Sequence, residues 1–224
     1  MAGKTLIKVK NIFRTYKLGE IKVPALNDIS LEINQGDFLI ITGRNGSGKS
    51  TLLRQLALVD RPNSGEIYFE EKEVTKMHSN DRRNLRLTRL GYIFQEYALI
   101  AELSALENVM LPAMMLEPIK KCRPRAELLL KKMGLQNKMN NLPSQLSGGE
   151  QQKVAIARSL INDPEVLFAD EPTANLDTFA AKDVLQIFKK LNQDEKHTIV
   201  MVTHEKEEEV FANRLIKLED GKIV

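Results

Sequence analysis

The pattern of apolar and polar residues divides the chain into three parts. Residues 4–42 alternate with the period of two that is typical of β-strands. Residues 79–159 have the spacing of amphipathic helices, interrupted by prolines. Beyond Pro164 short apolar runs, typical of buried parallel strands, alternate with a helical pattern over residues 178–192. The chain is therefore expected to be one α/β unit that starts with strands and carries a helical insertion.

Composition narrows the functional classes. The 224 residues suffice for one substantial domain, and 42% of them are hydrophobic. The net charge of +3 gives no electrostatic case for a nucleic-acid partner, so none is expected. The start of the chain lacks the apolar segment of a secretory signal, and apolar runs fall short of the ~20 residues that span a bilayer. Work at a membrane would need a second chain to supply the span.

Two polar segments are expected to face solvent. Cys122 lies in a polar stretch, and as the only cysteine it excludes an internal disulfide. We favour an inert thiol over a reactive one, because no histidine is near it in sequence. Arg82, Arg86 and Arg89 share one helix face, and a solvated face is favoured over a site for an anionic partner.

A glycine-rich segment, GRNGSGKST, follows an apolar run and opens a helix expected from Lys49 to about Leu58. It matches the phosphate-loop pattern G-x-x-x-x-G-K-[ST], in which backbone N–H groups and a helix N-terminus surround phosphate. Lys49 would neutralise the β- and γ-phosphates, and the Ser50 hydroxyl would ligate Mg²⁺. The alternative, a turn with a surface lysine, is disfavoured by the strand–loop–helix context. The predicted nucleotide-binding residues are Gly43, Arg44, Asn45, Gly46, Ser47, Gly48, Lys49, Ser50 and Thr51.

Polar residues at the ends of three apolar runs are candidates for catalysis. Asp170 ends the run VLFAD and would hold Mg²⁺ through water, and Glu171 would position or deprotonate an attacking water. Solvated loop acids are the alternative. Gln95, in YIFQEY, could ligate Mg²⁺ or hold a water, and His204 could donate a hydrogen bond to a γ-phosphate. Alone, a glutamine at a strand end means little, and a lone histidine is usually structural.

Together these residues resemble the ATP-binding subunits of ABC transporters. GRNGSGKST resembles the Walker A motif, VLFADE resembles Walker B, and Gln95 matches the Q-loop residue. NLD resembles the D-loop and ends on Asp177, His204 matches the switch histidine, and Tyr16 matches the aromatic residue that stacks on adenine. LSGGEQQKVAIARSL is similar to the signature motif, with Ser147, Gly148 and Gly149 as the residues that would contact nucleotide.

The resemblance implies a fold and a reaction. The fold would be the P-loop NTPase ABC-ATPase fold, with a mixed core sheet, an N-terminal antiparallel β subdomain and an inserted helical subdomain. One domain would fill residues 1–224, with residues 1–95 and 160–224 as the RecA-like core and residues 96–159 as the helical signature subdomain. The reaction would be hydrolysis of ATP to ADP and phosphate with Mg²⁺.

Narrower similarity, in FQEYALIAELSALENVMLP and DEPTANLD, is to the subgroup of lipoprotein-release and macrolide-export systems. The chain departs from it in Arg44-Asn45, where Pro-Ser is commoner, and in Lys153, where arginine is commoner. The similarity implies a peripheral subunit on the cytoplasmic face of the membrane. Its partner would be an integral membrane permease or a mechanotransmitting subunit.

Other classes remain as alternatives. A regulatory or cell-division ATPase of the ABC type would transmit force without moving cargo. An ABC-type clamp on DNA would need a long coiled-coil insertion, and one on ribosomes a second ATPase unit; the sequence has neither.

The start of the signature motif, Ser147-Gly148-Gly149, is interpreted as a second phosphate site, one without the lysine that follows the glycines of the phosphate loop. Ser147 and Glu150 have the S-x-x-E spacing of a capping box, which is its structural interpretation. The glycines between them would also expose N–H groups at a helix N-terminus. In the family this motif faces the Walker A motif of a second copy, so a head-to-tail dimer closed by ATP is expected. The membrane partner is expected on the segment after Gln95, where Met110, Met114 and Met115 would form an interface or a helical core.

Overall fold

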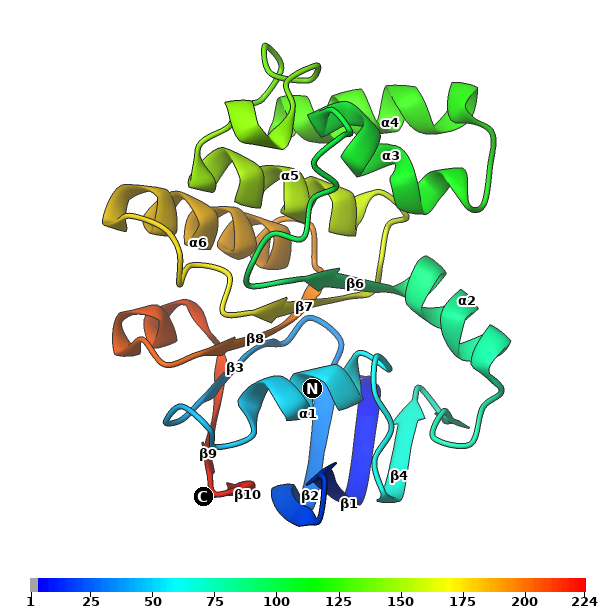
Figure 1. Cartoon of the computed structure of the whole chain (residues 1–224), viewed down its shortest axis with the longest axis vertical. Coiled ribbons are helices and arrows are strands. Elements are labelled where there is room, and N and C mark those ends of the chain that lie inside the picture. The colour runs from blue at the N-terminus through cyan, green and yellow to red at the C-terminus, as the bar shows by residue number, and fades with distance from the viewer. Residues whose placement is uncertain (1–3) are drawn as a thin grey trace.

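The computed structural model describes residues 4–224, so residues 1–3 of the predicted domain lie outside the described residues. Figure 1 shows the arrangement of the elements. The strands are β1 (Thr5–Leu18), β2 (Ile21–Asn34), β3 (Phe38–Thr42), β4 (Ser64–Phe69), β5 (Lys72–Glu73), β6 (Leu90–Ile93), β7 (Val166–Asp170), β8 (Thr198–Thr203), β9 (Arg214–Glu219) and β10 (Lys222–Ile223). The helices are α1 (Lys49–Leu56), α2 (Ser79–Arg89), α3 (Ala105–Met114), α4 (Ile119–Lys132), α5 (Gly148–Leu160) and α6 (Thr178–Gln193), with 3-10 turns η1 (Pro143–Gln145) and η2 (Lys206–Phe211).

Two sheets form the framework. The larger has the order β10-β9-β3-β8-β7-β6, and its strands are parallel except for β10, which pairs antiparallel with β9. The smaller is antiparallel, with the order β2-β1-β4-β5. The predicted fold class, a mixed core sheet with an N-terminal antiparallel part and inserted helices, is confirmed.

Side chains of the central strands alternate between two hydrophobic cores. Phe38 and Ile40 of β3 belong to the core that contains α3–α6, whereas Leu39 and Ile41 face the core that contains α1 and the antiparallel sheet. Every residue of β7 and of β8 is buried. A strand covered on both faces needs apolar residues throughout, which explains the continuous apolar runs in the sequence.

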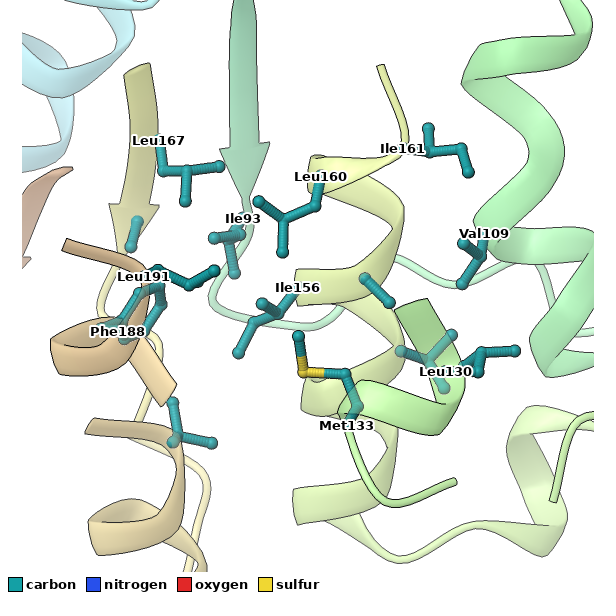
Figure 2. Packing of buried hydrophobic residues seen from close by; sticks show 14 of the residues in the cluster. Ile93, Val109, Leu130, Met133, Ile156, Leu160, Ile161, Leu167, Phe188 and Leu191 are labelled. Carbon is teal, nitrogen blue, oxygen red and sulfur yellow. The ribbon is translucent and has the colours of Figure 1, made fainter. Parts of the chain in front are cut away.

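The helical part shares one of these cores with the sheet. Figure 2 shows Ile93 of β6 facing Ile156 and Leu160 of α5, with Val109 and Leu130 on the far side of that helix. Because α5 packs against the sheet on one side and against α3 and α4 on the other, the signature motif at its N-terminus is held by both parts.

Two expectations of exposure were wrong. Cys122 is fully buried in α4, its thiol donates to Pro118 O at 3.4 Å, and burial raises its pKa. Arg82 is only 3% exposed and donates to the carbonyls of Val74, Leu58 and Asp60. The Arg82 guanidinium is buried although its stretch of sequence is polar. It donates to backbone carbonyls from other segments, and buried carbonyls need hydrogen-bond donors.

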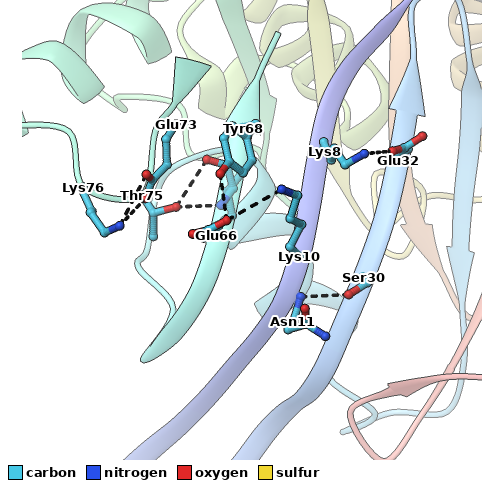
Figure 3. A network of polar contacts seen from close by, with 11 residues as sticks. Lys8, Lys10, Asn11, Ser30, Glu32, Glu66, Tyr68, Glu73, Thr75 and Lys76 are labelled. Carbon is cyan, nitrogen blue, oxygen red and sulfur yellow. Dashed lines mark hydrogen bonds and ion pairs between the residues drawn. The ribbon is translucent and has the colours of Figure 1, made fainter. Parts of the chain in front are cut away.

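The antiparallel sheet has a polar outer face. Figure 3 shows Lys8 paired with Glu32 across β1 and β2, and Lys10 near Glu66 of β4. Opposite charges on neighbouring strands stabilise such a face only modestly, because water screens exposed pairs. These two lysines are therefore matched by carboxylates on neighbouring strands.

Candidate functional site

The phosphate loop connects the carboxyl end of β3 to α1. Its glycines are required by close packing: a Cβ on Gly43 would lie 2.2 Å from Leu218 O, and one on Gly48 2.3 Å from Ala25 O. Gly48 also has φ 101° and is the N-cap of α1. A larger residue would therefore displace the loop from the helix N-terminus that makes it suitable for phosphate.

Two polar side chains of this loop, Ser47 and Lys49, are buried. Lys49 is 4% exposed, and its Nζ donates to Gly43 O at 2.9 Å and to Arg44 O at 3.1 Å. The Ser47 Oγ is buried and makes no hydrogen bond within residues 4–224. Buried polar atoms normally have partners, so this orphaned hydroxyl and the cationic Lys49 fit a phosphate ligand.

Asp170 is connected to the start of α1. Its Oδ1 accepts a 2.7 Å hydrogen bond from Ser50 Oγ, and its Oδ2 accepts one of 3.0 Å from Tyr92 OH. Arg54 NH2 lies 3.9 Å from the same Oδ2. Burial and the Asp170 charge raise the pKa of Tyr92 far above its ordinary value, so the phenol remains a donor.

These residues suit a hard cation. Serine and carboxylate oxygens are ligands that Mg²⁺ accepts, usually completed by phosphate oxygens and water. Among residues 4–224 no three or more His, Cys, Asp and Glu side chains form a metal cluster. The donor set therefore fits Mg²⁺ held jointly with nucleotide, and does not fit an all-protein metal cage.

Glu171 and His204 lie in contact. Glu171 directly follows β7 with φ 44°, and its N–H donates to Val202 O at 3.1 Å. Its Oε2 is 3.2 Å from His204 Nδ1, and its Oε1 is 3.8 Å from Lys49 Nζ. A left-handed backbone is uncommon outside glycine and here turns the carboxylate from the strand end toward the phosphate loop.

A cavity of about 440 Å³ brings part of the predicted site together, whereas Asp170 and His204 do not line it. Its lining includes Tyr16 of β1, Lys49 and Ser50 of α1, Gln95 after β6, and Glu171 after β7. The sequence did not indicate its remaining wall, Val23, Pro24 and Ala25 of β2, which offers apolar surface beside Tyr16. A phosphate loop at one end and an apolar, aromatic wall at the other match the two ends of a nucleotide.

Tyr16 is itself held in place. Its OH donates to Asp60 Oδ2 at 3.2 Å, and the Arg14 guanidinium lies 4.5 Å from its ring centroid. Arg14 also pairs with Asp60 at 2.9 Å. The ring is therefore restrained by a charged pair that the sequence did not predict.

The signature residues do not line this cavity. Ser147 is the N-cap of α5 and forms the capping box with Glu150, as the spacing predicted. Lys138 lies 3.0 Å from Glu150 Oε1 and balances its charge. The backbone N–H of Ser147 holds the pKa of Glu150 low. The segment Ser147–Glu150 contains no lysine, and the fold places Lys138 beside it.

Packing accounts for the glycines of the signature motif. A Cβ on Gly148 would lie 2.9 Å from Tyr97 OH, and one on Gly149 would lie 2.9 Å from Ala180 Cβ. Asp177 Oδ1 accepts from the N–H groups of Phe179 and Ala180 and so caps α6. The signature motif, the segment after Gln95 and the start of α6 are thus in direct contact.

The segment after Gln95 is fastened from two sides. Gln95 O accepts from Asn175 Nδ2 at 3.2 Å, while Arg158 of α5 donates to Tyr97 O at 2.7 Å and to Ala98 O at 2.6 Å. Tyr97 and Ala98 both have positive φ, at 58° and 50°. The sequence did not indicate Arg158, because its partners are backbone carbonyls about 60 residues away.

The fold and the site define an ATPase of the ABC type, and comparison with known proteins agrees. A family model described as ABC transporter matches residues 26–174. The chain belongs to the ABC transporter family, and it is an ATP-binding and ATP-hydrolysing protein of that family. No helix within residues 4–224 has the length and apolar character needed to cross a membrane.

Individual relatives support the predicted subgroup. The lipoprotein-releasing system ATP-binding protein LolD of Aquifex aeolicus is 45% identical over 217 residues, covering 96% of this chain and 93% of that protein. The macrolide export ATP-binding/permease protein MacB of Syntrophobacter fumaroxidans is 45% identical over 221 residues, covering 97% of this chain and 31% of MacB. This chain thus spans about a third of MacB and nearly all of LolD.

A solved structure has the same fold. The ATP-binding cassette MJ0796, described as a dimeric post-hydrolysis state bound to ADP and Pi, superposes with a TM-score of 0.91. The two chains are 39% identical, and the match covers 97% of this chain and 96% of that one. The predicted resemblance to the lipoprotein-release and macrolide-export subgroup is therefore confirmed at the level of family, fold and relatives.

Proposed function

We propose that two copies of this chain pack head to tail, hydrolyse ATP with Mg²⁺ at two shared sites, and drive an integral membrane partner on the cytoplasmic face. One observation carries the proposal. The cavity with Lys49, Gln95 and Glu171 does not include the signature motif, although both elements suit phosphate. A second copy resolves this, because its signature motif can close over the cavity of the first.

Each residue has a role that follows from its contacts. Lys49 and the loop N–H groups bind the phosphates, while Ser50 and Asp170, with Gln95, hold Mg²⁺. When bound, Mg²⁺ neutralises charge on the phosphate oxygens. Glu171 orients or deprotonates the attacking water, and His204, 3.2 Å from its carboxylate, completes the site. Tyr16 stacks on the adenine.

ATP acts as the link between the copies. Each nucleotide is bound by one phosphate loop and by the other copy's Ser147–Gly149, so it favours the closed dimer by its differential affinity. Hydrolysis removes that contribution and allows opening. Closing and opening of the dimer can move a membrane protein that is attached to the chain outside the nucleotide sites.

A groove beside α3 supports the proposal that a membrane partner docks on this chain. It has a volume of about 330 Å³, and its lining includes Phe94, Met115, Arg83 and Arg86. Met115 is 65% exposed, whereas Met110 is buried. The predicted helical core is therefore right for Met110, and an interface is supported for Met115. MacB is named as a macrolide export ATP-binding/permease protein and LolD as the ATP-binding protein of a lipoprotein-releasing system, and both names support this proposal.

The dimer is tested with Glu171→Gln. This variant keeps the shape of the side chain but removes the carboxylate, so ATP is expected to trap a dimer on size-exclusion chromatography. The matched control is Lys49→Ala in the same background, which should remain monomeric with ATP because phosphate binding is weakened. Rapid phosphate release by Glu171→Gln, or no dimer with saturating ATP, would refute the proposal.

The membrane partner is tested by photo-crosslinking from single positions in membranes of the source cells. Met115 is expected to yield an adduct with an integral membrane protein. Leu128 of α4 is equally exposed, at 65%, and lies outside the groove, so it is the control. Equal adducts from both positions, or none from Met115, would contradict this docking surface.

A further inference from the structure

The two segments that carry Glu171 and His204 touch at a second place. Thr173, two residues beyond Glu171, donates through Oγ1 to Glu208 Oε1. Glu208 lies in η2, four residues beyond His204. The contact between Glu171 and His204 is therefore accompanied by a parallel side-chain contact between the same two segments.

This second contact is buried. Glu208 is 5% exposed and Thr173 7% exposed. The other carboxyl oxygen, Glu208 Oε2, is buried and has no hydrogen-bond partner within residues 4–224. A buried polar atom left without a partner destabilises the folded state, and does so more strongly when it is charged.

A buried carboxyl oxygen without a partner lowers the stability of the folded chain and therefore needs an explanation. Such groups are concentrated at functional sites. An apolar side chain of similar volume at position 208 would occupy the same buried space without this penalty. Only a side chain that accepts a hydrogen bond can hold the Thr173 hydroxyl from that position.

Holding Thr173 matters because the loop before it is strained. Glu171 has φ 44°, and its backbone is fixed to β8 by one hydrogen bond to Val202 O. On the other side of Glu171, the hydroxyl of Thr173 reaches across to η2. The loop of the catalytic carboxylate is thus held between an anchor on β8 and an anchor on η2. The turn η2 begins two residues after His204, the residue that the carboxylate contacts.

We propose that Glu208 is a positioning residue for ATP hydrolysis: through Thr173 it fixes the Glu171 loop against the segment of His204 and so maintains the 3.2 Å contact between them. The inference rests on the proposed role of Glu171. Glu208 lies outside the nucleotide cavity, so it is expected to affect turnover and not nucleotide binding.

The test compares turnover, ATP affinity and thermal stability in six variants. Glu208→Leu and Thr173→Val remove the hydrogen bond, and each is expected to lower kcat about 10- to 100-fold, the scale of a small misplacement of a reacting group. Calorimetric ATP affinity should remain within about 2-fold, because no phosphate-binding group is altered. The melting temperature of Glu208→Leu should be unchanged or higher, because the unpartnered oxygen is gone.

Conservative variants complete the test. Glu208→Gln and Thr173→Ser keep an acceptor and a donor, so both should recover most of the turnover. In Glu208→Leu combined with Thr173→Val, the losses should not add, because either change breaks the same bond. Glu207→Leu, an exposed acid in the same turn, is the matched control and should behave as the wild type.

A fall in kcat that accompanies a lower melting temperature and weaker ATP binding would assign Glu208 a merely structural role. Unchanged kcat in Glu208→Leu would also overturn the inference. Failure of the proposed function is distinguishable, because it would appear as sustained turnover in Glu171→Gln. An inactive Glu171→Gln with an active Glu208→Leu would refute only the present inference.

Discussion

Ser50 Oγ donates a 2.7 Å hydrogen bond to Asp170 Oδ1, across 120 residues of sequence. The bond joins the first turn of α1 to the end of β7 and places a hydroxyl oxygen and a carboxylate oxygen side by side. Tyr92 OH holds the second carboxyl oxygen at 3.0 Å, so the Asp170 side chain is oriented from both sides. A cation held with nucleotide would meet ligands that are already positioned, which lowers the cost of binding.

Replacing Asp170 with asparagine should separate binding from hydrolysis. The amide keeps the shape and the bond from Ser50 but removes the charge that attracts Mg²⁺, so phosphate release should fall about 10²-fold or more. Calorimetry without Mg²⁺ should show ATP affinity close to the wild type. EDTA should abolish wild-type turnover. Asp183→Asn, an exposed acid paired with Lys153, is the control; similar Mg²⁺ titration curves for both variants would contradict the assignment.

Arg158→Lys should loosen the segment after Gln95. One ammonium cannot reproduce the two parallel donations to Tyr97 O and Ala98 O, and the left-handed residues cost about 1–2 kcal/mol each when unsupported. We expect faster amide hydrogen exchange over residues 95–98 and turnover reduced about 10-fold. Arg123→Lys, at an exposed pair with Glu127, is the control. Unchanged exchange in Arg158→Lys would show that other contacts hold the segment.

Gly149→Ala tests why the signature motif contains glycine. Its Cβ would lie 2.9 Å from Ala180 Cβ, so the variant should lose about 1–3 kcal/mol of stability and most of its ATP-driven dimer. The double variant with Ala180→Gly makes room for the new methyl group. Recovery of both properties, by chemical denaturation and by chromatography, would assign the glycine to packing. If stability recovers but the dimer does not, exposure of the backbone N–H groups is the reason for the glycine.

Arg82→Ala should destabilise the chain far more than Arg83→Ala in the same helix. Arg82 is buried and serves three carbonyls, whereas Arg83 is exposed. The loss is expected to be about 3 kcal/mol, or roughly 6–12 °C in Tm for a domain of this size. Burial lowers the pKa of Arg82 to about 10, which leaves the cation protonated at neutral pH. Equal thermal shifts for both variants would contradict the buried role.

The sequence by itself determined the features whose causes are local. The phosphate loop needs glycines at particular turns and a helix directly after them, and these lie within residues 43–51. The capping box is set by Ser147 and Glu150, three positions apart. The buried strands β7 and β8 were predictable because burial on both faces requires continuous apolar runs. Element types and motifs therefore followed from short stretches.

Only the tertiary structure decided which distant residues share an environment. Cys122 and Arg82 lie in polar stretches yet are buried, because neighbours far along the chain cover them. Arg158 gained its role from carbonyls in another segment, and Glu208 from a hydroxyl 35 positions away. Such contacts leave no periodic signal, since the free energy of burying a charge depends on partners that folding brings together. The motifs specify the chemistry, and long-range contacts specify how each reacting group is held.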